Sequence, residues 1–77
     1  MSITPEQCRA ARALLGWSQE QLKVTADVAK KTIADFERSA RVPYDRTLRD
    51  VQRALEEAGI EFIAENGGGV GVRFSKT

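Results

Sequence analysis

The apolar residues of the first 59 positions recur at intervals of three and four, which is the spacing of one face of an α-helix. This pattern predicts four helices: one over about 5–15, a second from residue 19, a third over about 29–37, and a fourth that follows Asp45 and ends at about 58. The expected inward residues are Cys8, Ala11, Leu15, Leu22, Val28, Ile33, Phe36, Leu48, Val51, Ala54 and Leu55.

Start and stop signals support these boundaries. Thr4 and Ser18 are each followed three residues later by glutamine, which is the pattern of a capping box at a helix N-terminus. Gly16 and Gly59 stand where a left-handed residue ends the first and fourth helices. Asp45 is expected to cap the fourth helix through its side chain.

After Gly59 the apolar period changes from about 3.6 residues to two. Residues 60–65 and 70–74 alternate apolar and other positions around an Asn-Gly-Gly-Gly turn, which predicts a β-hairpin. A two-stranded hairpin is marginal by itself in water. It is therefore expected to pack on the helices, to pair with another chain, or both.

Length and charge refine this picture. A chain of 77 residues is one domain, so we treat 1–59 as its helical part and 60–77 as an extension of the same domain and a candidate dimerisation element. The net charge is only +1, but it is unevenly distributed. Residues 1–55 hold ten Lys and Arg against seven Asp and Glu, whereas 56–77 hold two against four. The basic surface is thus expected in the helical part.

Several classes of function lose support from composition. One cysteine and no histidine argue against a disulfide, a zinc site or any other metal or cofactor. The sequence has no nucleophile motif and no paired carboxylates in a plausible cleft, so we do not expect an enzyme. The chain begins without a basic and apolar leader and has no run of membrane-spanning length, so the cytoplasm is the expected compartment.

The stretch from Cys8 to Gly59 resembles the Cro/CI-type (XRE) helix-turn-helix family of bacterial and phage repressors. The resemblance rests on Arg12, on residues 15–22 (LGWSQEQL) and on residues 31–38 (KTIADFER). It implies a mainly α fold, a four-helix Cro/CI-like (lambda-repressor-like) domain, here followed by a short C-terminal β-hairpin outside the family's core. It also implies a sequence-specific, DNA-binding transcriptional regulator, and we expect a repressor that acts as a homodimer on a palindromic operator.

The base-contacting residues are expected at the start of the third helix. In a helix-turn-helix, side chains near the N-terminus of the second of the two helices reach base edges in the major groove. Lys30, Lys31 and Thr32 occupy that end, and the resemblance assigns base contacts to the two lysine positions. Asp35, one turn on, either accepts from a cytosine amino group or screens the lysines.

Four residues are expected to contact phosphates. Gln19 begins the second helix and resembles the family's glutamine that clamps a phosphate, at a helix N-terminus that itself attracts anions. Arg38 and Arg41 fall where family members contact the DNA backbone. Arg46 is a further candidate.

Other residues have structural interpretations. The resemblance implies an ion pair between Arg12 and Glu37 that tethers the recognition helix. Trp17 is expected to cover the junction of the first two helices, and Cys8 to be a small buried residue. Tyr44 can reach a phosphate or pack, and we expect it to pack.

Three residues depart from the family pattern. Position 23 is lysine where a small residue is usual, position 27 is aspartate where glycine is preferred, and position 29 is alanine where a capping Ser or Thr is common. We expect Asp27 in the left-handed conformation, with its carboxylate available to help cap the third helix. Lys23 is expected to keep its ammonium in water.

These departures and the near-neutral charge leave an alternative function open. The same scaffold can serve as a protein-interaction module, antitoxin-like or antiactivator-like, in which the helix-turn-helix or the hairpin binds a protein partner.

Overall fold

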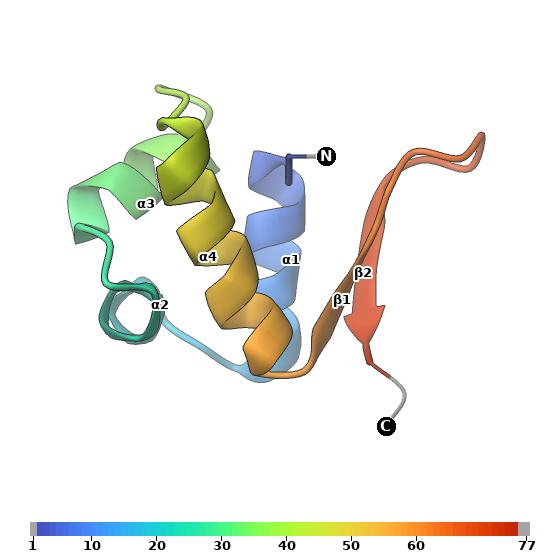
Figure 1. Ribbon diagram of the computed structural model, residues 1–77, viewed down its shortest axis with the longest axis horizontal. Helices are drawn as coiled ribbons and strands as arrows, with labels where there is room; N and C mark the ends of the chain where they lie inside the picture. The colour runs from blue at the N-terminus through green and yellow to red at the C-terminus, as the bar shows by residue number, and fades with distance from the viewer. Residues whose placement is uncertain (1, 76–77) are drawn as a thin grey trace.

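The computed structural model describes residues 2–75 (Figure 1). In chain order they form four helices and two strands: α1 (Pro5–Leu15), α2 (Gln19–Ala26), α3 (Lys30–Glu37), α4 (Asp45–Glu57), β1 (Ile60–Ile63) and β2 (Gly71–Phe74). The predicted mainly α fold with a C-terminal hairpin is confirmed.

Local hydrogen bonds explain where α1 and α2 begin. The Thr4 and Ser18 side chains accept from the backbone of Gln7 and Gln21, and the two glutamine side chains accept in return from the capping residues' backbone. Both predicted capping boxes are therefore present. Gly16 ends α1 at a φ of 69°, a conformation that costs glycine little.

The start of α4 differs from the prediction. Tyr44, not Asp45, is the capping residue, because the Tyr44 carbonyl accepts the first helical hydrogen bond, from Leu48 N at 3.0 Å. No side-chain hydrogen bond caps this helix, so the predicted role of Asp45 as a cap was wrong. Asp45 is instead the first helical residue, where its charge complements the helix dipole.

The core lies between the four helices and the inner face of the hairpin. The expected inward residues are buried there, except Leu15, which is half-buried and packs at the margin with Trp17. Ile3 and Ile60 join the core from outside the helices. The prediction that Tyr44 packs was wrong, since 87% of it is exposed.

The hairpin is shorter than its pattern suggested, and it docks on the helices. Ile60 pairs with Phe74 and Ile63 with Gly71 in an antiparallel register, while the whole connection from 64 to 70 is exposed. Strand β2 packs beside α1, and β1 beside α4 (Figure 1). The expectation that the hairpin packs on the helices is confirmed.

A buried glutamine fixes this docking. Gln7 Nε2 donates to the carbonyls of Ile63 (3.2 Å) and Gly71 (2.9 Å), one on each strand. The same side chain completes the capping box of α1. Gln7 therefore ties the start of the chain to the far end of the hairpin.

Candidate nucleic-acid interface

The turn between α2 and α3 depends on Asp27. This residue has φ 57° and ψ 48°, the left-handed conformation expected for it, and its N–H donates to the carbonyl of Lys23. Val28 follows and is buried, which anchors the turn to the core. The chain then enters α3 at Ala29.

The N-terminus of α3 has no side-chain cap. Ala29 accepts the first helical bond, from Ile33 N, but no side chain satisfies the free N–H groups of the first turn. The suggested help from the Asp27 carboxylate is absent. The end of α3 that is expected to meet DNA is thus held by packing rather than by a cap.

The two faces of α3 have opposite character. Ile33 and Phe36 are buried and fix the helix on the core. Lys30 and Lys31 point outward, with 56% and 83% of their side chains exposed. Two cations at the start of an exposed helix face can approach the base edges or phosphates of a major groove.

Acidic neighbours hold the lysines at the surface. Glu20 on α2 lies 3.3 Å from Lys23 Nζ and 3.8 Å from Lys30 Nζ. This arrangement also keeps the Lys23 ammonium at the surface, as expected. Ion pairs between exposed groups contribute little, about 0–1 kcal/mol. Lys23 and Lys30 can therefore exchange the Glu20 carboxylate for phosphates at small cost.

Asp35 pairs with two cations of the predicted interface, Lys31 and Arg38. It is mostly buried, and its carboxylate accepts from Lys31 at 3.2 Å and from Arg38 at 2.9 Å. The hydrogen bonds from Arg38 and then Lys31 hold the pKa of Asp35 below its ordinary value. Of the two roles considered for Asp35, this geometry fits the screening of its basic neighbours.

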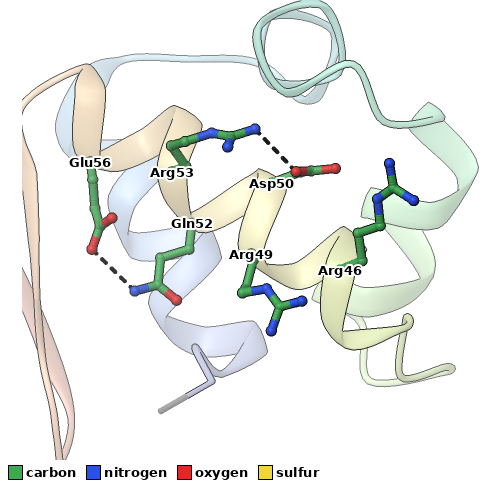
Figure 2. Close-up of a pocket in the computed structure, with 6 residues that line it drawn as sticks. All are labelled: Arg46, Arg49, Asp50, Gln52, Arg53 and Glu56. Carbon is green, nitrogen blue, oxygen red and sulfur yellow. Dashed lines mark hydrogen bonds and ion pairs between the residues drawn. The ribbon is translucent and has the colours of Figure 1, made fainter.

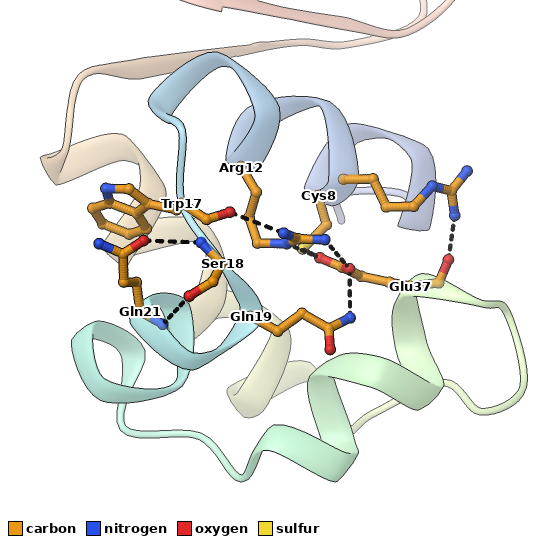
Figure 3. A network of polar contacts seen from close by, with 8 residues as sticks. Cys8, Arg12, Trp17, Ser18, Gln19, Gln21 and Glu37 are labelled. Atoms are coloured by element: carbon orange, nitrogen blue, oxygen red, sulfur yellow. Dashed lines mark hydrogen bonds and ion pairs between the residues drawn. The ribbon is translucent and has the colours of Figure 1, made fainter.

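Glu37 is the centre of a buried polar network (Figure 3). Its carboxylate, only 4% exposed, accepts from Arg12 Nη2 at 2.6 Å and from Arg12 Nε at 2.7 Å. It also accepts from Gln19 Nε2 at 2.9 Å and from the thiol of Cys8 at 3.1 Å. The ion pair implied by the family resemblance is present.

The protonation of Glu37 follows from two opposing effects. Burial alone would raise the pKa of Glu37, but hydrogen bonds from Arg12, Gln19 and Cys8 outweigh it and leave the pKa below its ordinary value. Burial, and then the bond to Glu37, raises the pKa of the Cys8 thiol. The network is thus a charged carboxylate held by a cation and two neutral donors.

Gln19 links this network to the surface. Its side-chain amide has two N–H groups, of which one donates to Glu37 Oε1. The half-buried residue begins α2, so its second N–H is available for a phosphate at that helix terminus. The Glu37 bond fixes the orientation that such a contact would need.

The expected arginine contacts fall in two places. Arg41, in the α3–α4 loop, lines a shallow depression with Lys31, Thr32 and Asp35. Arg38 closes α3 and pairs with Asp35. Arg41 therefore lies beside the predicted base-contacting residues Lys31 and Thr32, and Arg38 lies beside Asp35.

Arg46 lies apart from that depression. It lines the outer face of α4 together with Arg49, Asp50, Gln52, Arg53 and Glu56, over a shallow hollow (Figure 2). Within residues 2–75, Arg53 pairs with Asp50 at 3.1 Å, whereas neither Arg46 nor Arg49 has an ion pair. The outer face of α4 is therefore a second basic surface.

Three contacts were not anticipated from the sequence. Gln7 anchors the hairpin, the Cys8 thiol donates to Glu37, and an Arg9 guanidinium N–H donates to the Glu37 backbone carbonyl. Arg9 lies three residues before Arg12 on α1 and therefore shares its face of the helix. That spacing was the signal in the sequence that Arg9 also reaches Glu37. Nothing local marks the partners of Gln7.

The geometry is that of a helix-turn-helix: α2 and α3 are short helices joined by a turn with one residue, Asp27, in the left-handed conformation. The C-terminus of α3 is tied to α1, and its N-terminus is exposed. The family model described as Helix-turn-helix matches residues 9–61, well over half of the chain. The protein belongs to this helix-turn-helix family, of the Cro/CI (XRE) type, and the membership indicates a DNA-binding regulator of transcription.

A comparison with curated proteins finds no match to the chain. Within the part of the chain that the structure describes, no helix has the length and apolar character needed to cross a membrane.

Proposed function

We propose that this protein is a sequence-specific repressor that binds double-stranded DNA as a homodimer on a palindromic operator. The observation that carries the proposal is the two-ended character of α3. Its last residue is fixed by the Arg12–Glu37 pair, while Lys30 and Lys31 at its start are exposed. A helix held in this way can present the same side chains to the groove each time it docks.

The remaining contacts supply affinity. Arg38 lies at the C-terminal end of α3, and Arg41 lies in the following loop beside Lys31 and Thr32. Gln19 offers an N–H at the start of α2. Lys30, Lys31 and Thr32 read bases. Arg38, Arg41 and Arg46 neutralise phosphates, and Gln19 donates a hydrogen bond to one. Asp35 orients Lys31 and Arg38 by holding both.

A dimer follows from the size of the reading element. One eight-residue helix contacts few base pairs, and two copies related by a two-fold axis read two half-sites about one helical turn apart. Repression then results from occupying a promoter. The protein acts by binding alone, without a catalytic step or a cofactor, in the cytoplasm.

A gel shift tests DNA reading. The DNA upstream of the protein's own gene and a random-site pool are titrated with wild type and with Lys30→Ala/Lys31→Ala. The control, Arg49→Ala/Arg53→Ala, removes the same positive charge from α4. We expect the wild type and the control to bind and the lysine variant to lose binding. No shift by wild type at low salt, or equal loss in both variants, contradicts DNA reading by α3.

A second function has its own supporting observation. The row of Arg46, Arg49 and Arg53 on α4 offers a face that fits an acidic protein surface (Figure 2). An antitoxin-like or antiactivator-like role would use it. That role gains support if Arg49→Glu/Arg53→Glu abolishes regulation of a reporter gene while Lys30→Ala/Lys31→Ala leaves it intact.

A further inference from the structure

The outer edge of β2 is unpaired within the described chain. Ser75 N donates to Gly59 O at 2.7 Å, which fixes the phase of the antiparallel ladder. Hydrogen-bonded pairs alternate with non-hydrogen-bonded pairs along such a ladder, so Glu61–Arg73 and Ile63–Gly71 are the hydrogen-bonded pairs. Val72, between them, directs its N–H and C=O outward, away from β1.

The two edges of the hairpin are not equally open. On β1 the outward-directed positions begin with Ile60, which is fully buried, and continue with the half-buried Phe62. On the β2 side, Val70 is 44% exposed and Phe74 is 55% exposed, with Val72 between them. An exposed edge that carries apolar side chains is a template for another strand.

We propose that a second copy of this chain pairs antiparallel with the β2 edge, with the two-fold axis passing through Val72. The inference rests on the dimer in the proposed function and identifies the surface that forms it. The two hairpins then make one four-stranded sheet. Each Val72 exchanges two hydrogen bonds with Val72 of the other copy.

The side chains select this register. With the axis at Val72, the exposed Phe74 of each copy lies opposite Val70 of the other, and the two valines meet at the centre. Cross-strand apolar pairs of this kind stabilise a sheet. The three apolar positions therefore complement themselves under a two-fold rotation.

Charge rejects the adjacent register. An axis at Arg73 would set two arginines directly opposite each other, with Cα atoms about 4.5 Å apart. Like charges in that position are destabilising. With the axis at Val72, each Arg73 keeps its 2.7 Å pair with Glu61 and faces Gly71 of the other copy.

The glycine at 71 fits the same register. Its φ is not in the left-handed range, and an added Cβ would meet only Ile63, at an ordinary contact distance of 3.7 Å. One chain by itself therefore does not require glycine there. In the proposed sheet, the missing side chain leaves space for Arg73 of the second copy, and a glycine inside a strand often marks such an approach.

Cysteine cross-linking tests the register. The only native thiol, Cys8, is fully buried, so wild type serves as the unlinked control. We expect Val72→Cys to form a disulfide-linked dimer under mild oxidation, because Cα atoms in such a pair lie about 5.5 Å apart. Arg73→Cys should stay monomeric on a non-reducing gel, since the two positions are diagonal neighbours about 7–8 Å apart. Phe74→Cys/Val70→Cys should also link, as a second probe of the same register.

The outcomes separate this inference from the function it rests on. Linking of Arg73→Cys but not of Val72→Cys overturns the register. No linking by any variant overturns the β2 interface, and light scattering of wild type then shows whether a dimer forms elsewhere. A monomeric mass together with a specific gel shift overturns the interface and the dimer but leaves DNA reading standing.

Discussion

The guanidinium of Arg12 binds both carboxylate oxygens of Glu37, with Nη2 to Oε1 at 2.6 Å and Nε to Oε2 at 2.7 Å. This two-point contact joins α1 to the last residue of α3. Because a planar fork fixes direction as well as distance, it restrains how α3 sits on the domain. The exposed start of α3 is thus oriented by a buried contact at its other end.

Removing Arg12 should strongly destabilise the domain. Arg12→Met leaves the Glu37 charge buried with only neutral donors, and breaking one side of a buried pair costs about 3–5 kcal/mol. Urea unfolding monitored by far-UV circular dichroism measures the loss. A change within experimental error would mean that Glu37 finds enough solvent or other donors to keep its charge.

The double variant Arg12→Met/Glu37→Met is the control for this prediction. It removes both charges, so its free energy of unfolding should fall by less than the sum of the two single variants. Strict additivity would show that the two residues contribute independently.

The pH dependence of stability follows from the lowered pKa of Glu37. A carboxyl whose folded pKa lies below its unfolded value, about 4.3, stabilises the protein above that value and loses the contribution as the pH falls through the folded pKa. The free energy of unfolding should therefore decline below about pH 4.3. Glu37→Gln should flatten that decline, although Asp35, whose pKa is also lowered, leaves part of it. An unchanged acid slope in Glu37→Gln contradicts the assignment.

Gln7→Glu tests the hairpin anchor. Glutamate at this position still completes the capping box but has no N–H for the carbonyls of Ile63 and Gly71. The loss of both hydrogen bonds and the placing of a carboxyl at a buried position should cost at least about 1–3 kcal/mol. The matched control is Gln21→Glu, the same change in the exposed capping box of α2, which should be nearly neutral. Equal effects of the two changes would place the role of Gln7 in capping alone.

The elements were predictable because their signals are local. Capping boxes, the glycine after α1 and the change of apolar period all lie within a few residues of the boundaries they set. The predicted cap at Asp45 was wrong because the helix begins one residue earlier than expected, with the Tyr44 carbonyl accepting its first hydrogen bond. No local pattern in the sequence marks that position. Tyr44 was expected to pack rather than to reach a phosphate, but it is exposed where the loop enters α4.

The site was predictable only in part. The family pattern supplied Arg12 and Glu37, and geometry then added the donors Gln19 and Cys8 around the same carboxylate. The second role of Gln7 could not be inferred, because its hydrogen-bond partners lie 56 and 64 residues away in the chain. Contacts of that range depend on how the hairpin folds back over α1.

A serine at position 29 should stabilise α3. Ala29 is the N-cap and makes no side-chain hydrogen bond, whereas the Oγ of serine can accept from the first turn. Ala29→Ser should add about 1 kcal/mol and raise the melting temperature by roughly 4–8 °C. Ala40→Ser, at an exposed position that caps no helix, is the control. A melting temperature unchanged by Ala29→Ser would show that the first turn of α3 is already satisfied by water.

Salt dependence should distinguish phosphate contacts from base contacts. Each phosphate neutralised contributes about −0.9 to the slope of log Kobs against log salt. Arg41→Ala should therefore make the slope shallower by about one unit and weaken binding to all sequences alike. Lys30→Ala should instead reduce the discrimination between the operator and single-base variants of it.

Arg53→Ala, which removes a charge that Asp50 already pairs, is the control and should leave the slope unchanged. Fluorescence anisotropy over a range of salt concentrations measures all four proteins. If Arg41→Ala and Arg53→Ala change the slope equally, the loop beside α3 has no specific contact with the DNA backbone, and only the net charge matters.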